Sequence, residues 1–401
     1  MNVIIKKSYA EGNVNSPPSK SISHRALISG AFSEGSVVRN IAFSKDIEAT
    51  LGCLEKLGAF VYKEDGYIRI GGLDVNKIVD GTVIDCNESG STLRFLLPIC
   101  MLADKAVTLE GKGRLMERPL SVYEEICRKE GIFLSKGSTS VSVKGRLSGG
   151  HYFVRGDISS QFITGLLFAL PLLEGDSTLT VTGKFESASY IDLTLSVLSE
   201  FGIRIDRKDN VFYIKGGQKY ISADYTVEGD CSNSAFLEGF NLLGGNVCVK
   251  GLCDSTLQGD SVYRVIYPKI KASGGTYDIS DCPDLGPVLF ALAAYYGGAV
   301  FKGTARLRIK ESDRAKAMAD ELEKFGIAVE IFDNSVVIRK GELKAPQHPL
   351  CGHNDHRIVM ALSLLCSVTG GIIEGAEAVS KSYPDYFEVI KNLGIDLEIQ
   401  G

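Results

Sequence analysis

Apolar and polar positions follow one pattern that recurs six times along the chain. In each copy a stretch with helical spacing ends at a glycine, and an alternating, strand-like stretch follows, as in LEKLGAFVY and LSEFGIRID. A glycine directly after the last helical turn is a common helix stop. The pattern therefore predicts six helices that each end at a glycine before a strand. We call these six residues the marker glycines: Gly58, Gly131, Gly202, Gly274, Gly326 and Gly394.

A second helix pattern, more apolar than the first, lies between these copies. It begins with small polar residues, continues with apolar residues and ends at an acidic or glycine turn before a strand, as in SGSTLRFLLPICMLADKAVTL. The marker glycines are 73, 71, 72, 52 and 68 residues apart, and such a period indicates a structural repeat. We therefore expect an α/β (α+β) fold built from six β-α-β-α-β-β units.

The repeats predict two globular domains. Three units fit between residues 20 and 228, which form the first domain, and three fit between 229 and 401. The last unit lacks a strand that the apolar segment 2–6 can supply, so residues 1–19 plus 229–401 form a second, discontinuous domain. We expect the chain to cross between the domains near 16–20 and 226–230, with a substrate cleft between them. A single large, irregular α/β protein is the alternative.

Composition narrows the class of protein. The 401 residues are too many for one ordinary core, and 44% hydrophobic with 23% charged residues is typical of a globular chain. A net charge of −5 argues against nucleic-acid binding, which needs a basic surface. Most of the ten cysteines lie in apolar stretches without a C-x-x-C pair, as reduced thiols do. No apolar run is long enough for a signal peptide or a membrane span, so we expect a cytoplasmic protein.

Four arginines follow small polar residues where the helices are predicted to start: Arg25, Arg94, Arg314 and Arg357. A cation in the first turn faces the positive end of the helix dipole, which costs about 0.3–1 kcal/mol. A bound phosphate or carboxylate reverses that sign and uses the free N–H groups. The pattern predicts small, multiply charged anionic ligands. The alternative is that each arginine pairs with a neighbouring carboxylate at the surface.

Other chemistries have weaker support. The chain has no G-x-x-x-x-G-K-[ST] loop and no G-x-G-x-x-G turn after a strand. His348, His353 and His356 lack a matching ligand at metal spacing, so we expect no metal. Asp355 and His356 form either a catalytic pair or a helix cap, and the sequence leaves both open.

Eight segments, found in the family's order through essentially the whole chain, resemble the enolpyruvyl transferases, and among them the enolpyruvylshikimate-phosphate synthases. They include SPPSKSISHRALI (16–28), RLRIKESDRAKAMADELEKFG (306–326), NDHRIVMAL (354–362) and SKSYPDYFE (380–388). The resemblance implies two domains of three units each. It also implies transfer of the enolpyruvyl group of phosphoenolpyruvate to the 5-hydroxyl of shikimate-3-phosphate, with release of phosphate and no cofactor. The chain departs from the family pattern at Glu88, Phe95 and Arg306.

The resemblance also implies the roles of individual residues. Asp284 would accept the proton of the attacking hydroxyl, and Glu311 and Lys20 would be the proton carriers. Tyr190 would pack beside the shikimate-3-phosphate site, and Gly90 would admit glyphosate, an inhibitor that occupies the phosphoenolpyruvate pocket. The residues implied for phosphoenolpyruvate are Lys20, Gly90, Arg118, Gln161, Arg314, Arg357 and Lys381. Those implied for shikimate-3-phosphate are Lys20, Ser21, Arg25, Ser159, Ser160, Gln161, Ser187, Asp284 and Lys310.

Taken one by one, these residues also have ordinary structural interpretations. Lys20 can be a solvated residue of a linker, and Glu311 can be one partner of an ion pair. Asp284 can cap a helix, and the serines can be helix caps or turn residues. Three rivals exist for the whole chain: the sister transferase that acts on UDP-N-acetylglucosamine, a six-unit clamp around DNA, and a binding module without catalysis. The sister enzyme should have Asn after its lysine, where this chain has Ser21. A clamp would spread cations over its helix faces. We expect a monomer whose partners are the two small anionic substrates.

Overall fold

The computed structural model describes residues 1–401, except for the side chain of residue 273. The chain divides into two compact units, Pro18–Glu228 and Met1–Pro17 with Gly229–Gly401. We call the first the middle unit and the second the split unit. Each has its own hydrophobic core. In the described residues no helix is both long and apolar enough to cross a lipid bilayer.

The middle unit contains three four-stranded sheets with one shared topology. In each, the first two strands pair in parallel, and an antiparallel hairpin follows with its second strand innermost. The first sheet has the order β14 (Asp224–Thr226), β3 (Ser36–Arg39), β5 (Tyr67–Gly71), β4 (Phe60–Glu64). The second has the order β6 (Thr82–Asp85), β7 (Val107–Glu110), β9 (Ser140–Lys144), β8 (Phe133–Lys136). The third has the order β10 (His151–Arg155), β11 (Ser177–Thr182), β13 (Val211–Ile214), β12 (Ile205–Lys208).

Two kinds of helix connect these strands. Apolar helices, buried over most of their length, form the centre of the core, because a helix that is apolar all round must lie inside. Amphipathic helices precede the hairpins and bury one face. The apolar helices are α1 (Lys20–Ala31), α3 (Gly90–Cys100) and α5 (Ser160–Ala169). The amphipathic ones are α2 (Lys45–Lys56), α4 (Ser121–Glu130) and α6 (Ala188–Glu200).

The split unit repeats the plan. One sheet has the order β16 (Thr276–Asp278), β17 (Ala299–Lys302), β19 (Ser335–Ile338), β18 (Val329–Ile331). Another has the order β20 (Leu350–Cys351), β21 (Gly371–Glu374), β1 (Asn2–Ile5), β22 (Leu397–Gln400). Its apolar helices are α7 (Cys231–Leu242), α9 (Gly286–Tyr295) and α11 (His356–Thr369), and the others are α8 (Tyr263–Ser273), α10 (Arg314–Lys324) and α12 (Tyr386–Asn392).

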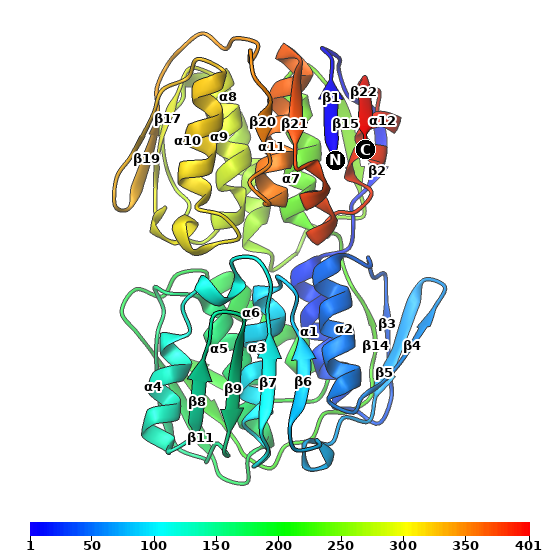
Figure 1. Cartoon of the computed structure of the whole chain (residues 1–401), viewed down its shortest axis with the longest axis vertical. Coiled ribbons are helices and arrows are strands. Elements are labelled where there is room, and N and C mark those ends of the chain that lie inside the picture. Colours follow the sequence, from blue (N-terminus) through cyan, green and yellow to red (C-terminus); the bar gives the residue numbers. More distant parts are fainter. The chain divides into compact units, whose positions relative to one another are not determined.

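The N-terminal strand β1 completes the last sheet. It lies antiparallel between β21 and β22, with Val3 opposite Ile373 on one side and Ile399 on the other (Figure 1). The predicted pairing of segment 2–6 with the C-terminal strands is confirmed. The helix stops are also confirmed, because all six marker glycines have positive φ, between 68° and 110°.

One of the six repeats is incomplete. The chain after α8 forms only β16, which pairs with β17 of the next sheet, so β15 (Asn246–Lys250) and β2 (Glu11–Asn15) form a two-stranded sheet. Gly274 and Gly326 are the pair of markers only 52 residues apart. That interval is too short for another hairpin, and the structure departs from the predicted repeat at this point.

Candidate active site

Several predicted residues of the middle unit lie at the starts of its apolar helices. Lys20 is the first residue of α1, Gly90 of α3 and Ser160 of α5. The hydroxyl of Ser159 accepts a hydrogen bond from the backbone N–H of Gln161 (3.3 Å), so Ser159 caps α5. Helix starts offer N–H groups and a positive dipole end to an anion.

Arg25 is almost fully buried, with 3% of its surface exposed, and its hydrogen-bond acceptors are neutral. Its Nε donates to the hydroxyl of Thr194 (2.9 Å), and its Nη atoms donate to the carbonyls of Ser21 (2.6 Å) and Tyr190 (3.1 Å). Burial lowers the pKa of Arg25 to about 10, because the charged form loses hydration. A bound anion would restore a counter-charge here. Ser187, with φ of 56°, lies at the start of the helix that carries Tyr190.

Arg94 joins the starts of α3 and α5. Its Nη1 donates to Gln161 Oε1 (2.7 Å), and Gln161 Nε2 donates to the hydroxyl of Ser91 (3.0 Å). The prediction of four first-turn arginines is wrong for Arg94 and for Arg25. Because α3 and α1 begin at Gly90 and Lys20, these two arginines lie in the second turn of their helices.

Gly90 lies directly against the guanidinium of Arg118, a second residue predicted for the same substrate. A Cβ atom built on Gly90 would overlap Nη1 of Arg118 and lie 2.7 Å from its Cζ. Arg118 follows a 3₁₀ turn at Leu115–Glu117 and is mostly buried. The space that a larger residue would need at position 90 is therefore occupied by a cation.

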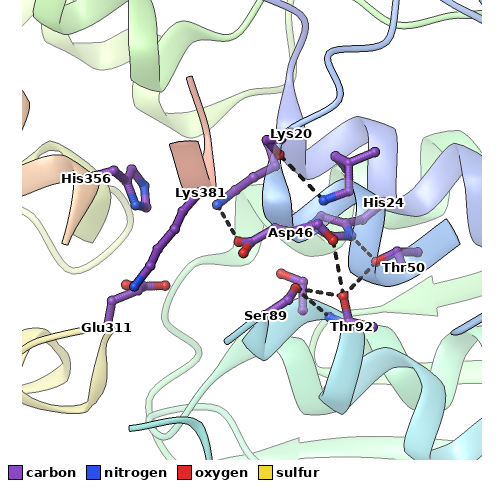
Figure 2. Close-up of polar contacts among 12 residues, drawn as sticks. Lys20, His24, Asp46, Thr50, Ser89, Thr92, Glu311, His356 and Lys381 are labelled. Atoms are coloured by element: carbon purple, nitrogen blue, oxygen red, sulfur yellow. Dashed lines mark hydrogen bonds and ion pairs between the residues drawn. The ribbon is translucent and has the colours of Figure 1, made fainter. Parts of the chain in front are cut away.

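Lys20 is held by a carboxylate that sequence reasoning missed. Its Nζ lies 2.9 Å from Asp46 Oδ2, and both side chains are mostly buried (Figure 2). Asp46 lies in the first turn of α2, after its cap Ser44. Nothing in the sequence connects it with a lysine 26 positions away. The interpretation of Lys20 as a solvated linker residue is wrong.

A buried chain of hydroxyls supports this region. His24 Nδ1 lies 2.8 Å from the hydroxyl of Thr50, which is 2.6 Å from that of Thr92, and Thr92 donates to Ser89 Oγ (2.7 Å) (Figure 2). The three helices α1, α2 and α3 are thereby linked by polar contacts. Burial, with Lys20 and Arg25 nearby, holds the pKa of His24 well below its usual value of 6.5, so the ring is neutral.

The split unit gathers the predicted acid–base residues around Asp284, which lies in a 3₁₀ turn at Pro283–Leu285 just before α9. Its Oδ1 is 3.0 Å from Lys310 Nζ and 2.7 Å from Arg314 Nη1, and Arg357 Nη2 is 3.8 Å from Oδ2. Burial would raise the pKa of Asp284, but Lys310, Arg314 and Arg357 outweigh it and hold the pKa well below 3.8. Asp284 is therefore ionised at neutral pH.

Arg314 is the centre of this cluster. Besides Asp284, it contacts Glu311 Oε2 through Nη2 (2.8 Å) and Asp355 Oδ2 through Nε (2.9 Å), and only 1% of its side chain is exposed. Burial would lower the pKa of Arg314, but the carboxylates of Asp355, Glu311 and Asp284 raise it well above its usual value. The expected alternative, a carboxylate partner, is therefore present for this arginine, but in a buried position.

The remaining predicted cations adjoin the same cluster. Arg357 Nη1 donates to Asn233 Oδ1 (3.0 Å), and Lys381 Nζ donates to the backbone carbonyl of Asn354 (2.6 Å). Asp355 accepts from the backbone N–H of Arg357 (2.9 Å), which confirms its interpretation as a helix cap. His356 Nδ1 lies 3.9 Å from Asp355 Oδ1, beyond hydrogen-bond distance, so the two do not form a catalytic pair in this geometry.

Comparison with known proteins gives concordant results. Residues 4–390 match the family model described as EPSP synthase (3-phosphoshikimate 1-carboxyvinyltransferase). A 3-phosphoshikimate 1-carboxyvinyltransferase of Clostridium kluyveri is 41% identical, covering 99% of this chain and 98% of that protein. One of Clostridium acetobutylicum is 43% identical over 96% of each. The solved EPSP synthase of Acinetobacter baumannii has a TM-score of 0.79 at 23% identity over the full length of both chains, which shows a common fold.

Proposed function

We propose, because the chain belongs to the EPSP synthase family, that it transfers the enolpyruvyl group of phosphoenolpyruvate to the 5-hydroxyl of shikimate-3-phosphate and releases phosphate. The observation that carries this proposal is the match over nearly the whole chain to relatives of 41% and 43% identity that share this enzyme name. The contacts described above support specific roles for the residues of each unit.

The middle unit supplies the groups for the phosphate of shikimate-3-phosphate. Arg25 carries a buried positive charge among neutral acceptors, so a phosphate would provide its missing counterion. Ser159, Ser160 and Gln161 lie at the start of α5, where hydroxyl and N–H groups can donate to the same anion. Ser21 and Ser187 complete the proposed set in this unit, and Lys310 and Asp284 are the residues of the split unit that we propose for the same substrate.

Phosphoenolpyruvate carries a phosphate and a carboxylate, and the proposed site has several cations for them. Gly90 leaves room for Arg118, while Lys20 lies at the start of α1 and Gln161 lines the pocket. In the split unit Arg314, Arg357 and Lys381 take the remaining negative charge. Because each nitrogen of the Arg314 side chain already faces a carboxylate, the substrate carboxylate must replace Asp284 or Glu311 as its partner.

The proton transfers follow from the same geometry. Asp284 accepts the proton of the 5-hydroxyl as that oxygen bonds to C2 of phosphoenolpyruvate, while Glu311 or Lys20 protonates the methylene carbon. Elimination then removes a proton from the new methyl group, re-forms the double bond and expels phosphate. Phosphoenolpyruvate bound at Arg314 and Arg357 would draw these cations from Asp284, and the carboxylate would become a stronger base.

Phosphate release tests the proposal. We expect purified protein to release phosphate only when phosphoenolpyruvate and shikimate-3-phosphate are supplied together, and mass spectrometry to show shikimate-3-phosphate gaining the enolpyruvyl group. UDP-N-acetylglucosamine replaces shikimate-3-phosphate in a parallel reaction and should give no phosphate. Release from phosphoenolpyruvate alone, or transfer to the nucleotide sugar only, would contradict the proposed function.

A further inference from the structure

Two adjacent residues before α11 contact the three residues whose cations the split unit offers to phosphoenolpyruvate, two of them at the charged group and Arg357 at its backbone N–H. Asp355 Oδ2 accepts from Arg314 Nε (2.9 Å), and Asp355 Oδ1 accepts from the backbone N–H of Arg357 (2.9 Å). The carbonyl of Asn354 accepts from Lys381 Nζ (2.6 Å). One short segment of the chain therefore holds the guanidinium of Arg314, the backbone of Arg357 and the ammonium of Lys381.

Of the three carboxylates around Arg314, only Asp355 is inaccessible. Its side chain is 0% exposed, whereas those of Asp284 and Glu311 are 21% and 19% exposed. Asp355 accepts from Nε (2.9 Å) and more weakly from Nη2 (3.3 Å), whereas Asp284 contacts Nη1 and Glu311 contacts Nη2. A substrate carboxylate can thus exchange with Asp284 or Glu311 at the Nη atoms, while Asp355 keeps the guanidinium in place from behind.

The loop that ends at Asp355 is itself fixed from another helix. His353 and Asn354 both have positive φ, 49° and 50°, a region in which Asn, Asp and His are the commonest residues after glycine. Glu321 of α10, almost fully buried, lies 2.8 Å from His353 Nε2, accepts from the backbone N–H of Cys351 (2.9 Å) and pairs with Lys324 (2.9 Å). These contacts hold the loop against α10, the helix that begins with Arg314.

We propose that Asp355 is a positioning residue for phosphoenolpyruvate, which orients Arg314 and Arg357 without contacting the substrate. This inference rests on the proposed function and adds a residue to the site. Ser312, whose hydroxyl donates to Asp355 Oδ2 (3.0 Å), fixes the carboxylate in turn. A carboxylate that only caps α11 would need one oxygen, whereas both oxygens of Asp355 are engaged.

The variant Asp355→Asn separates positioning from capping. The amide oxygen of the asparagine can still accept a hydrogen bond from the backbone N–H of Arg357. Its NH2 group, however, would face Arg314 Nε, and no hydrogen bond can form because both groups are donors. Because small misplacements of binding groups cost up to about 100-fold, we expect the KM for phosphoenolpyruvate to rise about 10- to 100-fold. The KM for shikimate-3-phosphate should change less than about threefold. The same rise in both constants, or no rise, would overturn the proposal.

The matched control is Glu330→Gln, in the same unit. It weakens an exposed ion pair in which Arg339 Nε and Nη2 donate to the two carboxylate oxygens of Glu330 (2.8 and 2.7 Å). Both KM values should stay unchanged. If Asp355→Asn does not fold, Ser312→Ala removes only one donor to Asp355. It should raise the KM for phosphoenolpyruvate about two- to fivefold, and an unchanged value would count against the proposal.

A spectroscopic readout is independent of catalysis. In ¹H–¹⁵N spectra of the arginine side chains, we expect the Nε–H resonance of wild-type Arg314 to differ in chemical shift from those of exposed arginines and to exchange slowly with solvent. In Asp355→Asn this resonance should lose both properties. An unchanged Arg314 signal would overturn the positioning role even in an inactive protein. If the wild-type protein shows no turnover but Asp355→Asn still alters the Arg314 signal, the result contradicts the proposed function and leaves the positioning role of Asp355 intact.

Discussion

Arg25 in the middle unit and Arg314 in the split unit are buried to nearly the same extent, 3% and 1% exposed, but their surroundings differ in charge. Arg25 donates to hydroxyl and carbonyl oxygens, and its pKa falls to about 10. Arg314 lies among three carboxylates, which raise its pKa. Burial is similar in the two cases, so the neighbouring charges decide the direction of the shift.

The difference suggests a division of work between the units, in which the middle unit binds a phosphate and the split unit transfers protons. A buried cation without a carboxylate partner favours the arrival of an anion, which suits the proposed binding of a phosphate by the middle unit. A cluster in which carboxylates and cations balance keeps Asp284 ionised in the absence of substrate. Substrate anions that take the cations of the split unit would change its proton affinity, which suits proton transfer.

Turnover should respond most strongly to the loss of Asp284. Asp284→Ala removes the proposed proton acceptor, and a positioned general base typically contributes about 10²- to 10⁴-fold. We expect kcat to fall by that factor and binding of shikimate-3-phosphate to weaken far less, measured by initial rates and equilibrium dialysis. Asp320→Ala, which removes an exposed carboxylate paired with Lys316 on α10, is the control and should keep wild-type kcat. Wild-type turnover in Asp284→Ala would show that another group accepts the proton.

The next effect is on stability and should separate the two arginines. Arg314→Gln leaves Asp355, Asp284 and Glu311 without their shared counterion, which should cost about 3–5 kcal/mol of unfolding free energy. Arg25→Gln loses several buried hydrogen bonds, but removal of a buried charge without a carboxylate partner offsets part of that cost, so the free energy should change by only about 1–2 kcal/mol. Urea unfolding at neutral pH measures both. Equal losses would show that burial, and not the neighbouring charges, sets the energetics.

A third effect concerns the space beside Arg118. Gly90→Ala places a methyl group against the guanidinium, which can move because it is the flexible end of its side chain. We expect inhibition by glyphosate, competitive with phosphoenolpyruvate, to weaken about 10-fold or more, and the KM for phosphoenolpyruvate to rise less. Gly52→Ala, on α2 with nothing within 4 Å of the added Cβ, is the matched control. Inhibition constants that change equally in both variants would refute the steric explanation.

The smallest effect is the pH dependence of stability. The pKa of Asp284 is lowered in the folded state, so its contribution to stability is present above its unfolded value, about 4, and is lost as the pH falls through the lower folded value. The stability difference between the wild type and Asp284→Asn should therefore shrink as the pH falls below about 4. Thermal unfolding from neutral to acidic pH checks this. A difference that grows on acidification would mean that Asp284 is not held ionised.

Much of the fold could be predicted because its signals are local. Gly58 and Gly131 stop helices through their own backbone conformations, and the apolar pattern of α9 determines its burial. The two-stranded sheet of β2 and β15 could not be predicted in the same way, because strand pairing depends on distant segments. The short interval between Gly274 and Gly326 was its only sequence signal.

The site could be predicted only in part. Residue types and family motifs pointed to Lys20 and Arg314 and to the carboxylates of Asp284 and Glu311, but not to Asp46, and they did not connect Asp355 with Arg314. Asp46 and Asp355 lie 26 and 41 positions from their partners, and only tertiary structure brings each pair together. The expected position of Arg25 in a first turn was wrong because the helix begins earlier, at Lys20. The roles of these residues in substrate binding and proton transfer stay predictions.

The division of work between the units is tested most directly by measuring, on the same preparations, the Kd for shikimate-3-phosphate and the kcat of Arg25→Gln and Asp284→Ala. We expect Arg25→Gln to bind shikimate-3-phosphate about 100-fold or more weakly, because one charge-assisted phosphate contact is lost. Asp284→Ala should weaken this binding far less than Arg25→Gln does, but turn over at least about 100-fold more slowly. Wild-type binding by Arg25→Gln together with loss of binding in Asp284→Ala would contradict the division.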